Sequence, residues 1–259
     1  MPRTAMRHFR DDLGRARGLV AHASTMPTGN AGAILLREDV LRAGWMFAAG
    51  AMDAYFCDAY ADIVAAVLLC KSREQAVALP SHIDDLQVPV STVLDSRPQR
   101  DNWKWRMASR ALIERQNILS LGAVQQHFNK FCRRHHRLFG DVLDFWATRH
   151  DATARVFGVT PAQYSAMAGA ALHTQRQDSL EAMEQRFNDV IFQRRHDCIH
   201  NCDRPKVTPQ RLRRPGTVSN VIRDAEFLVT RFEDHITSEV RHFLSGLGFS
   251  NAAIAQVGY

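Results

Sequence analysis

Apolar residues recur at helical spacing along much of the chain, most clearly between about Leu36 and Lys71. This spacing, with an apolar side chain at every third or fourth position, is typical of an α-helix that buries one face. Three aspartates, Asp53, Asp58 and Asp62, interrupt its longest apolar stretch. Because charged side chains are costly at membrane depth, the pattern favours a buried helix over a membrane span.

Two further long helices are predicted in the second half of the chain. The first covers about 178–200 and is expected to stop near Asn201, because Pro205 lies just beyond it. The second covers about 217–244 and is followed by Gly246, a residue that commonly ends helices. Together with the helix over 36–71, these two helices are expected to supply most of the hydrophobic core.

The middle of the chain, 73–170, is predicted to be a helical insertion between the first long helix and the helix over 178–200. Prolines divide its first part, and helical periodicity returns over 101–132 and 135–149. Thr160 followed by Pro161 has the pattern of an N-cap with proline at the first helical position, which predicts a short helix to about Leu172.

The two ends of the chain are expected to lie outside the helical domain. Five arginines occur before residue 18, and a Pro/Gly/Asn stretch at 27–30 should break any helix, so 1–30 is predicted to be a basic N-terminal arm or a short helix. The segment 249–259 is predicted to be a C-terminal tail. Because no strand pattern is convincing, the fold class is all-α, with a single helical-bundle domain over 31–248.

Composition adds two constraints to this picture. An apolar content of 46% in 259 residues is ample for a core, and 33 Lys and Arg against 27 Asp and Glu give a net charge of +6 that suits a polyanionic partner without requiring one. Five cysteines and a start, Met-Pro-Arg-Thr, without an apolar signal segment lead us to expect reduced thiols and a cytoplasmic location.

The segment 192–205, Phe-Gln-Arg-Arg-His-Asp-Cys-Ile-His-Asn-Cys-Asp-Arg-Pro, carries the chemistry that is most informative. Arg195 is a permanent cation, and His200, five positions later, titrates near neutrality. RNA brings its own nucleophile, the 2′-hydroxyl, so its cleavage needs no metal. His200 is a candidate general base or acid, Arg195 a candidate phosphate ligand, and His196 and Asn201 are candidates to orient the substrate or the histidine.

Helical phase by itself does not bring the two main residues together. Five residues of a straight helix rotate His200 by roughly 140° from Arg195, so convergence requires the helix to unwind near His200. Asn201 suits such a turn because asparagine tolerates left-handed backbone. By contrast, His196 and His200 are four positions apart and share a face.

Simpler interpretations of the same residues stay open. An arginine and a histidine near a helix C-terminus can merely complement the helix dipole. Cys198, His200 and Cys202 invite a zinc interpretation, but they lack the separated ligand pairs that wrap a tetrahedral ion. We therefore expect thiols without a metal, and no cofactor.

Two landmarks, in order, resemble the HEPN family. Arg194 to Asn201 is similar to its R-x4-6-H signature, and residues 42–55 are similar to the opening helix of the RiboL-PSP type, where an acidic residue precedes Ala-Tyr. The resemblance covers roughly 36–71 and 178–247. It implies an α-helical domain that dimerises so that two motifs form one composite, metal-independent ribonuclease site, often in defence, as a toxin or in RNA processing. A regulatory or antitoxin partner protein accompanies some such systems.

Carried over to this chain, the resemblance makes Arg195 and His200 the catalytic pair, with His196 and Asn201 in support. Asp53 matches the acidic position of the family, and we expect it either to pair with Arg194 or Arg195 or to be an ordinary helix-surface carboxylate. Some toxin members carry a tyrosine two residues after the motif histidine. Here that position is Cys202, so regulation by tyrosine modification is not expected.

The loop after the motif is strongly basic, and its proximity to His200 predicts contacts with RNA phosphates. The predicted RNA-binding residues are Arg204, Lys206, Arg211, Arg213 and Arg214. The alternative interpretation is a loop of the same composition that contacts only solvent. A second basic cluster spans 130–136, and Trp103 and Trp105 alternate with Lys104 and Arg106 as core residues or base-stacking platforms.

Two functions therefore compete. The first is a homodimeric endoribonuclease that cleaves RNA by 2′-hydroxyl attack. The second is a non-catalytic helical HEPN module that binds a partner protein or a nucleotide and keeps the motif for dimer packing. Loss of cleavage without unfolding, on substitution of Arg195 or His200, separates the first from the second.

Overall fold

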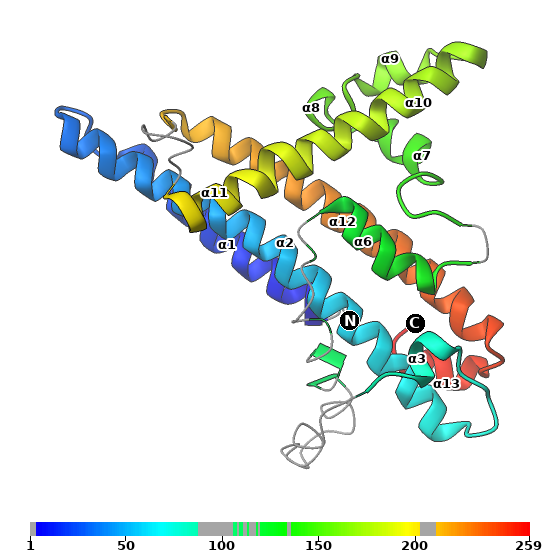
Figure 1. Ribbon diagram of the computed structural model, residues 1–259. Coiled ribbons are helices and arrows are strands. Elements are labelled where there is room, and N and C mark those ends of the chain that lie inside the picture. The colour runs from blue at the N-terminus through cyan, green and yellow to red at the C-terminus, as the bar shows by residue number, and fades with distance from the viewer. Residues whose placement is uncertain are drawn as a thin grey trace.

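The computed structural model describes residues 4–87, 106–107, 109–110, 113, 118, 120–133, 136–202 and 211–259. Three long helices lie side by side at its centre: α1 (Thr4–Thr25), α2 (Ala31–Arg73) and α12 (Pro215–Gly246). α1 and α2 form an antiparallel hairpin, and α12 runs along them in the direction of α2 (Figure 1). Regular structure in the described part of the chain is entirely helical, which confirms the all-α prediction.

The central helix, α2, begins and ends close to the predicted positions but is 43 residues long. Asn30 caps its N-terminus by accepting a hydrogen bond from the backbone N–H of Ala33 at 2.9 Å. Its buried residues lie on several sides of the helix, because α1, α12 and the motif-bearing helix all pack against it. Within the described residues, no helix combines the length and apolar character that a membrane crossing demands.

α1 corrects the prediction of a separate basic arm. It is a helix of 22 residues, and Phe9, Leu13 and Val20 on one side are buried in the common core. The approach to α2 is close: a Cβ added at Gly44 of α2 would lie 3.4 Å from side-chain atoms of both Val20 and Val218. The density of arginines on the outer side of α1 concealed an apolar stripe in which three of the seven buried residues are alanines.

Edge-to-face aromatic packing joins the central helices to the insertion. The ring centroid of Phe232 of α12 lies 5.1 Å from that of Phe56 of α2 and 4.8 Å from that of Phe128. Phe128 ends α6 (Leu121–Phe128), which Ser120 caps through the N–H of Ala123. These buried rings close the core on the side of the insertion.

The insertion itself consists of short helices, which agrees with the predicted helical character. They are α3 (Ser81–Asp84), α6, η1 (Asn129–Phe131), α7 (Leu143–Ala147), α8 (Ala154–Phe157) and α9 (Pro161–Ser165). Thr160 and Gln163 form the capping box of α9, so its predicted start is confirmed, but it ends at Ser165 instead of continuing to Leu172. Most of 101–120, the first part of the stretch 101–132 that was predicted to be helical, lies outside the described residues.

The predicted helix over 178–200 is a longer run of three parts, α10 (Gly169–Glu184), η2 (Gln185–Phe192) and α11 (Gln193–Asn201). It crosses the central helices (Figure 1) and contributes few buried residues, so its share of the core is smaller than the sequence suggested. α1, which was not among the predicted long helices, contributes more. Asp224, buried on α12, holds the crossing run through Arg186 at 2.7 Å and α8 through Arg155 at 2.8 Å.

The C-terminal segment is also part of the core, which corrects the prediction of a tail. Ser250 caps α13 (Asn251–Gln256), and Ala253 and Ile254 are buried. The Cys70 thiol of α2 donates to the carbonyl of Ala253 at 3.7 Å. Burial of two apolar side chains therefore attaches this short helix to the end of α2.

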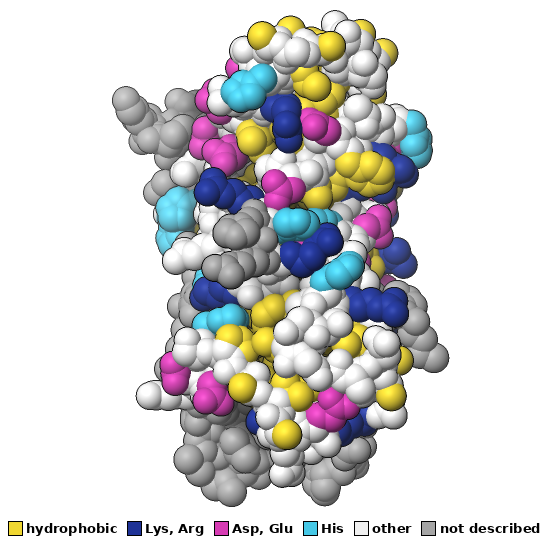
Figure 2. All heavy atoms as spheres, turned by 90° about the vertical axis from the view of Figure 1, so that its right-hand side faces the viewer, with side chains coloured by type: hydrophobic (Ala, Val, Ile, Leu, Met, Phe, Trp, Pro, Cys, Tyr) yellow, Lys and Arg dark blue, Asp and Glu magenta, His cyan; other side chains and the backbone are white. Residues whose placement is uncertain are grey.

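Two residues of the second basic cluster, Arg133 and His136, are engaged in the fold, whereas Arg134 and His135 lie outside the described residues. Glu239, fully buried on α12, accepts hydrogen bonds from the backbone N–H of Arg133 at 2.9 Å and from its guanidinium at 2.6 Å, and lies 3.3 Å from His136 Nδ1. Burial alone would raise the pKa of Glu239, but the Arg133 hydrogen bonds and charge outweigh it and lower the pKa to about 2. On the face drawn in Figure 2, basic and histidine side chains are likewise mixed with acidic ones.

Removal of the central aromatic ring should be costly. Phe232→Ala is expected to lower the free energy of unfolding by about 3 to 5 kcal/mol, because it leaves a cavity among rings that cannot close it. Phe145→Ala, at a ring that is largely exposed, is the matched control and should change stability by no more than about 0.5 kcal/mol. Urea unfolding measures both, and equal effects would contradict the assigned core.

Glu239 predicts a loss of stability in acid. Because its folded pKa of about 2 is below the ordinary 4.5, it stabilises the protein above pH 4.5, and this stabilisation disappears as the pH falls towards 2. Since Arg133 is half-exposed and screened, about 1 to 2 kcal/mol is expected. Unfolding free energies of Glu239→Gln should change less with pH in this window. An exposed-site control, Glu181→Gln, should follow wild type; parallel curves for all three proteins would contradict the assignment.

Candidate functional site

The motif helix α11 follows a stretch of π-helix, η2, and is docked on α2 by a buried hydrogen bond. The indole N–H of Trp45 donates to the carbonyl of Ile191 at 3.1 Å. Phe187, Ile191 and Phe192 of η2 are buried. π-Helical turns are rare and frequent at functional sites, and their wider winding changes the direction of every side chain that follows.

The two motif arginines contact two residues of α2. Arg195 Nη2 lies 3.6 Å from Asp53 Oδ2, and both side chains are about three-quarters buried. The guanidinium of Arg194 stacks over the Trp45 ring, 4.9 Å from its centroid. Of the two expected partners for Asp53, the structure thus places Arg195 beside it. Burial raises the pKa of Asp53, and the charge of Arg195 opposes this increase.

The motif histidines lie together on the outer side of α11. The ring centroids of His196 and His200 are 4.3 Å apart, and both residues are exposed. This arrangement is the one expected for positions four apart on a helix. The imidazole of His200, the candidate general base, is therefore accessible to a substrate from solvent, and the imidazole of His196 packs against it.

The helix does not unwind at His200, which corrects the predicted route to convergence. α11 continues through Asn201, and the left-handed residue is Cys202, with φ 49° and ψ 40°. The N–H of Cys202 donates to the carbonyl of Asp197, five positions earlier, and the helix ends there. Because the helix is regular between them, Arg195 and His200 stay separated by roughly 140° around its axis. A single chain presents its arginine towards α2 and its histidine towards solvent.

Neither of the two thiols around the motif is part of a disulfide. Cys198 is half-buried and Cys202 exposed. Among the residues that the structure describes, no three or more His, Cys, Asp or Glu side chains are grouped as a metal site. Nothing in this part of the chain therefore assembles the ligands for the zinc interpretation.

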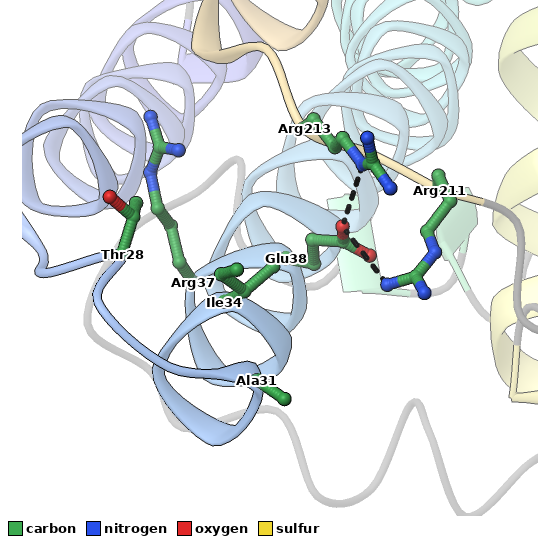
Figure 3. A pocket seen from close by; sticks show the side chains of 7 residues that line it. All are labelled: Thr28, Ala31, Ile34, Arg37, Glu38, Arg211 and Arg213. Atoms are coloured by element: carbon green, nitrogen blue, oxygen red, sulfur yellow. Dashed lines mark ion pairs between the residues drawn. The ribbon is translucent and has the colours of Figure 1, made fainter.

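The predicted RNA-binding loop is only partly described. Arg204 and Lys206 lie outside the described residues, whereas Arg211, Arg213 and Arg214 are exposed just before α12. Arg211 and Arg213 point towards one carboxylate of α2, Glu38 (Figure 3). Sequence reasoning missed Glu38 and the docking role of Trp45. The pairing of Glu38 with Arg42, four positions later, was the available local signal.

No family model, curated protein or solved structure matches the chain.

Asp53→Asn tests the environment of Arg195. Since the folded pKa of Asp53 is raised above its ordinary 3.8, the folded state holds this proton more tightly than the unfolded state. Wild type should therefore lose stability relative to Asp53→Asn as the pH rises above 3.8. Unfolding free energies of the two proteins across the acid range measure this slope. A slope of opposite sign would mean that Arg195 outweighs burial, and a flat difference would show that Asp53 is not desolvated.

Proposed function

We propose that this protein is a metal-independent endoribonuclease that cleaves RNA by 2′-hydroxyl attack at a site composed of two copies of the chain. The observation that carries the proposal is the geometry of α11. Arg195 is held beside Asp53, and His200 stands exposed at the end of the same helix against His196. A fixed cation and a solvent-facing imidazole are the two groups that this reaction requires.

In the proposed reaction His200 takes the proton of the 2′-hydroxyl, and the 2′-oxygen forms a bond to phosphorus. Arg195 donates two hydrogen bonds to the crowded phosphorane, where negative charge accumulates. The bond to the 5′-oxygen then breaks, and the His200 imidazolium returns the proton to it. The products are a 2′,3′-cyclic phosphate and a 5′-hydroxyl. His196, in ring contact with His200, orients it, and Asn201 is a further candidate for that role.

A second copy of the chain solves the separation of Arg195 from His200. The regular helix directs the two side chains to different sides, so the proposal requires His200 of one copy to approach the exposed quarter of the Arg195 side chain of the other across a shared cleft. Val190 and Ile199, 40% and 46% exposed on the motif-bearing run, offer apolar contact area for such a pairing. The HEPN resemblance implies the same arrangement.

The biological setting follows only from the resemblance. It favours a cytoplasmic RNase that acts in defence or as a toxin and that a regulatory or antitoxin partner protein restrains. The non-catalytic module that binds a partner protein or nucleotide is the alternative, and the experiment below distinguishes the two.

Purified wild type, Arg195→Ala and His200→Ala are to be incubated with mixed single-stranded RNAs in EDTA. We expect cleavage by wild type with cyclic phosphate ends, and a loss of at least about a hundredfold in each variant, the usual contribution of a general base or charge-stabilising group. His242→Ala and Arg223→Ala, exposed residues of α12, are the matched controls. Light scattering and circular dichroism report whether each variant remains dimeric and folded.

Mixing the variants tests the composite site. A heterodimer of Arg195→Ala and His200→Ala contains one intact pair if each site takes its arginine and histidine from different copies, so partial activity should return. No recovery would contradict the shared cleft. Folded wild-type dimers that cleave none of the RNAs would contradict the ribonuclease and favour the binding module.

A further inference from the structure

A pocket of about 380 Å³ lies where the connection between α1 and α2 meets the chain entering α12. Arg37, Arg211 and Arg213 contribute three guanidinium groups to its lining, and Glu38 one carboxylate. Figure 3 shows Arg37 on one side and Arg211 and Arg213 on the other, with Glu38 between them. The three arginines come from two segments that are far apart in the sequence.

Glu38 brings two of these cations together. The residue is 2% exposed, and its Oε1 lies 3.6 Å from Arg211 Nη1 and 4.0 Å from Arg213 Nε. These distances are too long for hydrogen bonds, and Oε1 has no hydrogen-bond partner. The carboxylate thus attracts both guanidinium groups without occupying their N–H donors.

The charge of the pocket is unbalanced. Three arginines against one glutamate leave two positive charges in the lining, and Glu38 is also shared with Arg42 at 3.4 Å. The Arg37 Nε–H donates to the carbonyl of Ala23 at 2.8 Å, which fixes its position. The side chains of Arg211 and Arg213 are 59% and 70% exposed, so their donors are open to a ligand.

We propose that this pocket binds a phosphate group of a nucleotide. Guanidinium forks match the geometry and charge of phosphate oxygens; Arg211 and Arg213 approach each other at Glu38, Arg37 adds charge from the opposite side, and the Thr28 hydroxyl in the lining can add a donor. Ala31 and Ile34 supply an apolar wall for the attached sugar or base, and the volume is that of a small-molecule site. The phosphate belongs either to a free nucleotide or to a strand of RNA. Binding here does not require cleavage at the motif.

Calorimetric titration of the full-length protein with pyrophosphate and with 5′-AMP tests the site. We expect both probes to bind. Arg211→Ala combined with Arg213→Ala is expected to weaken binding roughly tenfold or more, because each charge-assisted hydrogen bond that is lost removes part of the binding free energy. Arg37→Ala should weaken it independently. Arg223→Ala, an exposed arginine of α12 outside the pocket, is the control and should bind as wild type does.

Competition identifies the source of the phosphate. In the His200→Ala protein, single-stranded RNA that displaces 5′-AMP would assign the pocket to the strand, and failure to displace it would assign a free nucleotide. The proposal is overturned if wild type binds neither probe, or if the folded double variant binds them with unchanged affinity. Cleavage without probe binding would refute the pocket alone, and probe binding without cleavage would refute the ribonuclease alone.

Discussion

The hydrogen bond from the Trp45 indole to the Ile191 carbonyl is the contact on which the arrangement of the motif depends. The bond is buried, so the loss of either group would leave the other unpaired in apolar surroundings, at a cost in stability. The two groups therefore hold η2 and α11 against α2. The same indole carries Arg194 on its face, and Arg195 then meets Asp53 further along α2. One side chain of the central helix thus sets the position of the motif helix.

Buried carboxylates fix the positions of the peripheral segments in a related way. Asp224 and Glu239 on α12, and Glu38 on α2, are each almost inaccessible to solvent and each attract arginines from elements that lie outside the central helices. A buried charge must be paired, so these residues impose a position on whatever supplies the cation. At Asp224 and Glu239 the guanidinium groups are hydrogen-bonded to the carboxylate, whereas at Glu38 those of Arg211 and Arg213 are not. The carboxylate therefore leaves the N–H donors of Arg211 and Arg213 unused, and this difference is the basis for proposing an anion site there.

Periodicity predicted the elements whose apolar positions recur over many helical turns. α2 and α12 follow the expected positions because they face a common core with leucine, valine and phenylalanine at helical spacing. α1 was misjudged because arginines are interspersed with its apolar positions, and this charge suggested an exposed arm. The run from α10 to α11 has a similar apolar pattern yet crosses the outside of the bundle. Periodicity indicates that a helix has a buried face, but it does not indicate how many of its residues are buried.

Local chemistry determined what could be read from the sequence alone: the all-helical class, the central helix, and a motif with a cation and an imidazole at the end of a helix. Hydrogen-bond patterns and hydrophobic spacing act over a few residues, and they are visible in a single chain. Only the tertiary structure decided that Arg195 lies beside Asp53, that a π-helical turn directs the motif, and that Glu38 gathers arginines from the loop before α12. These contacts join segments distant in sequence, and their distances follow from how the helices cross and not from any local spacing.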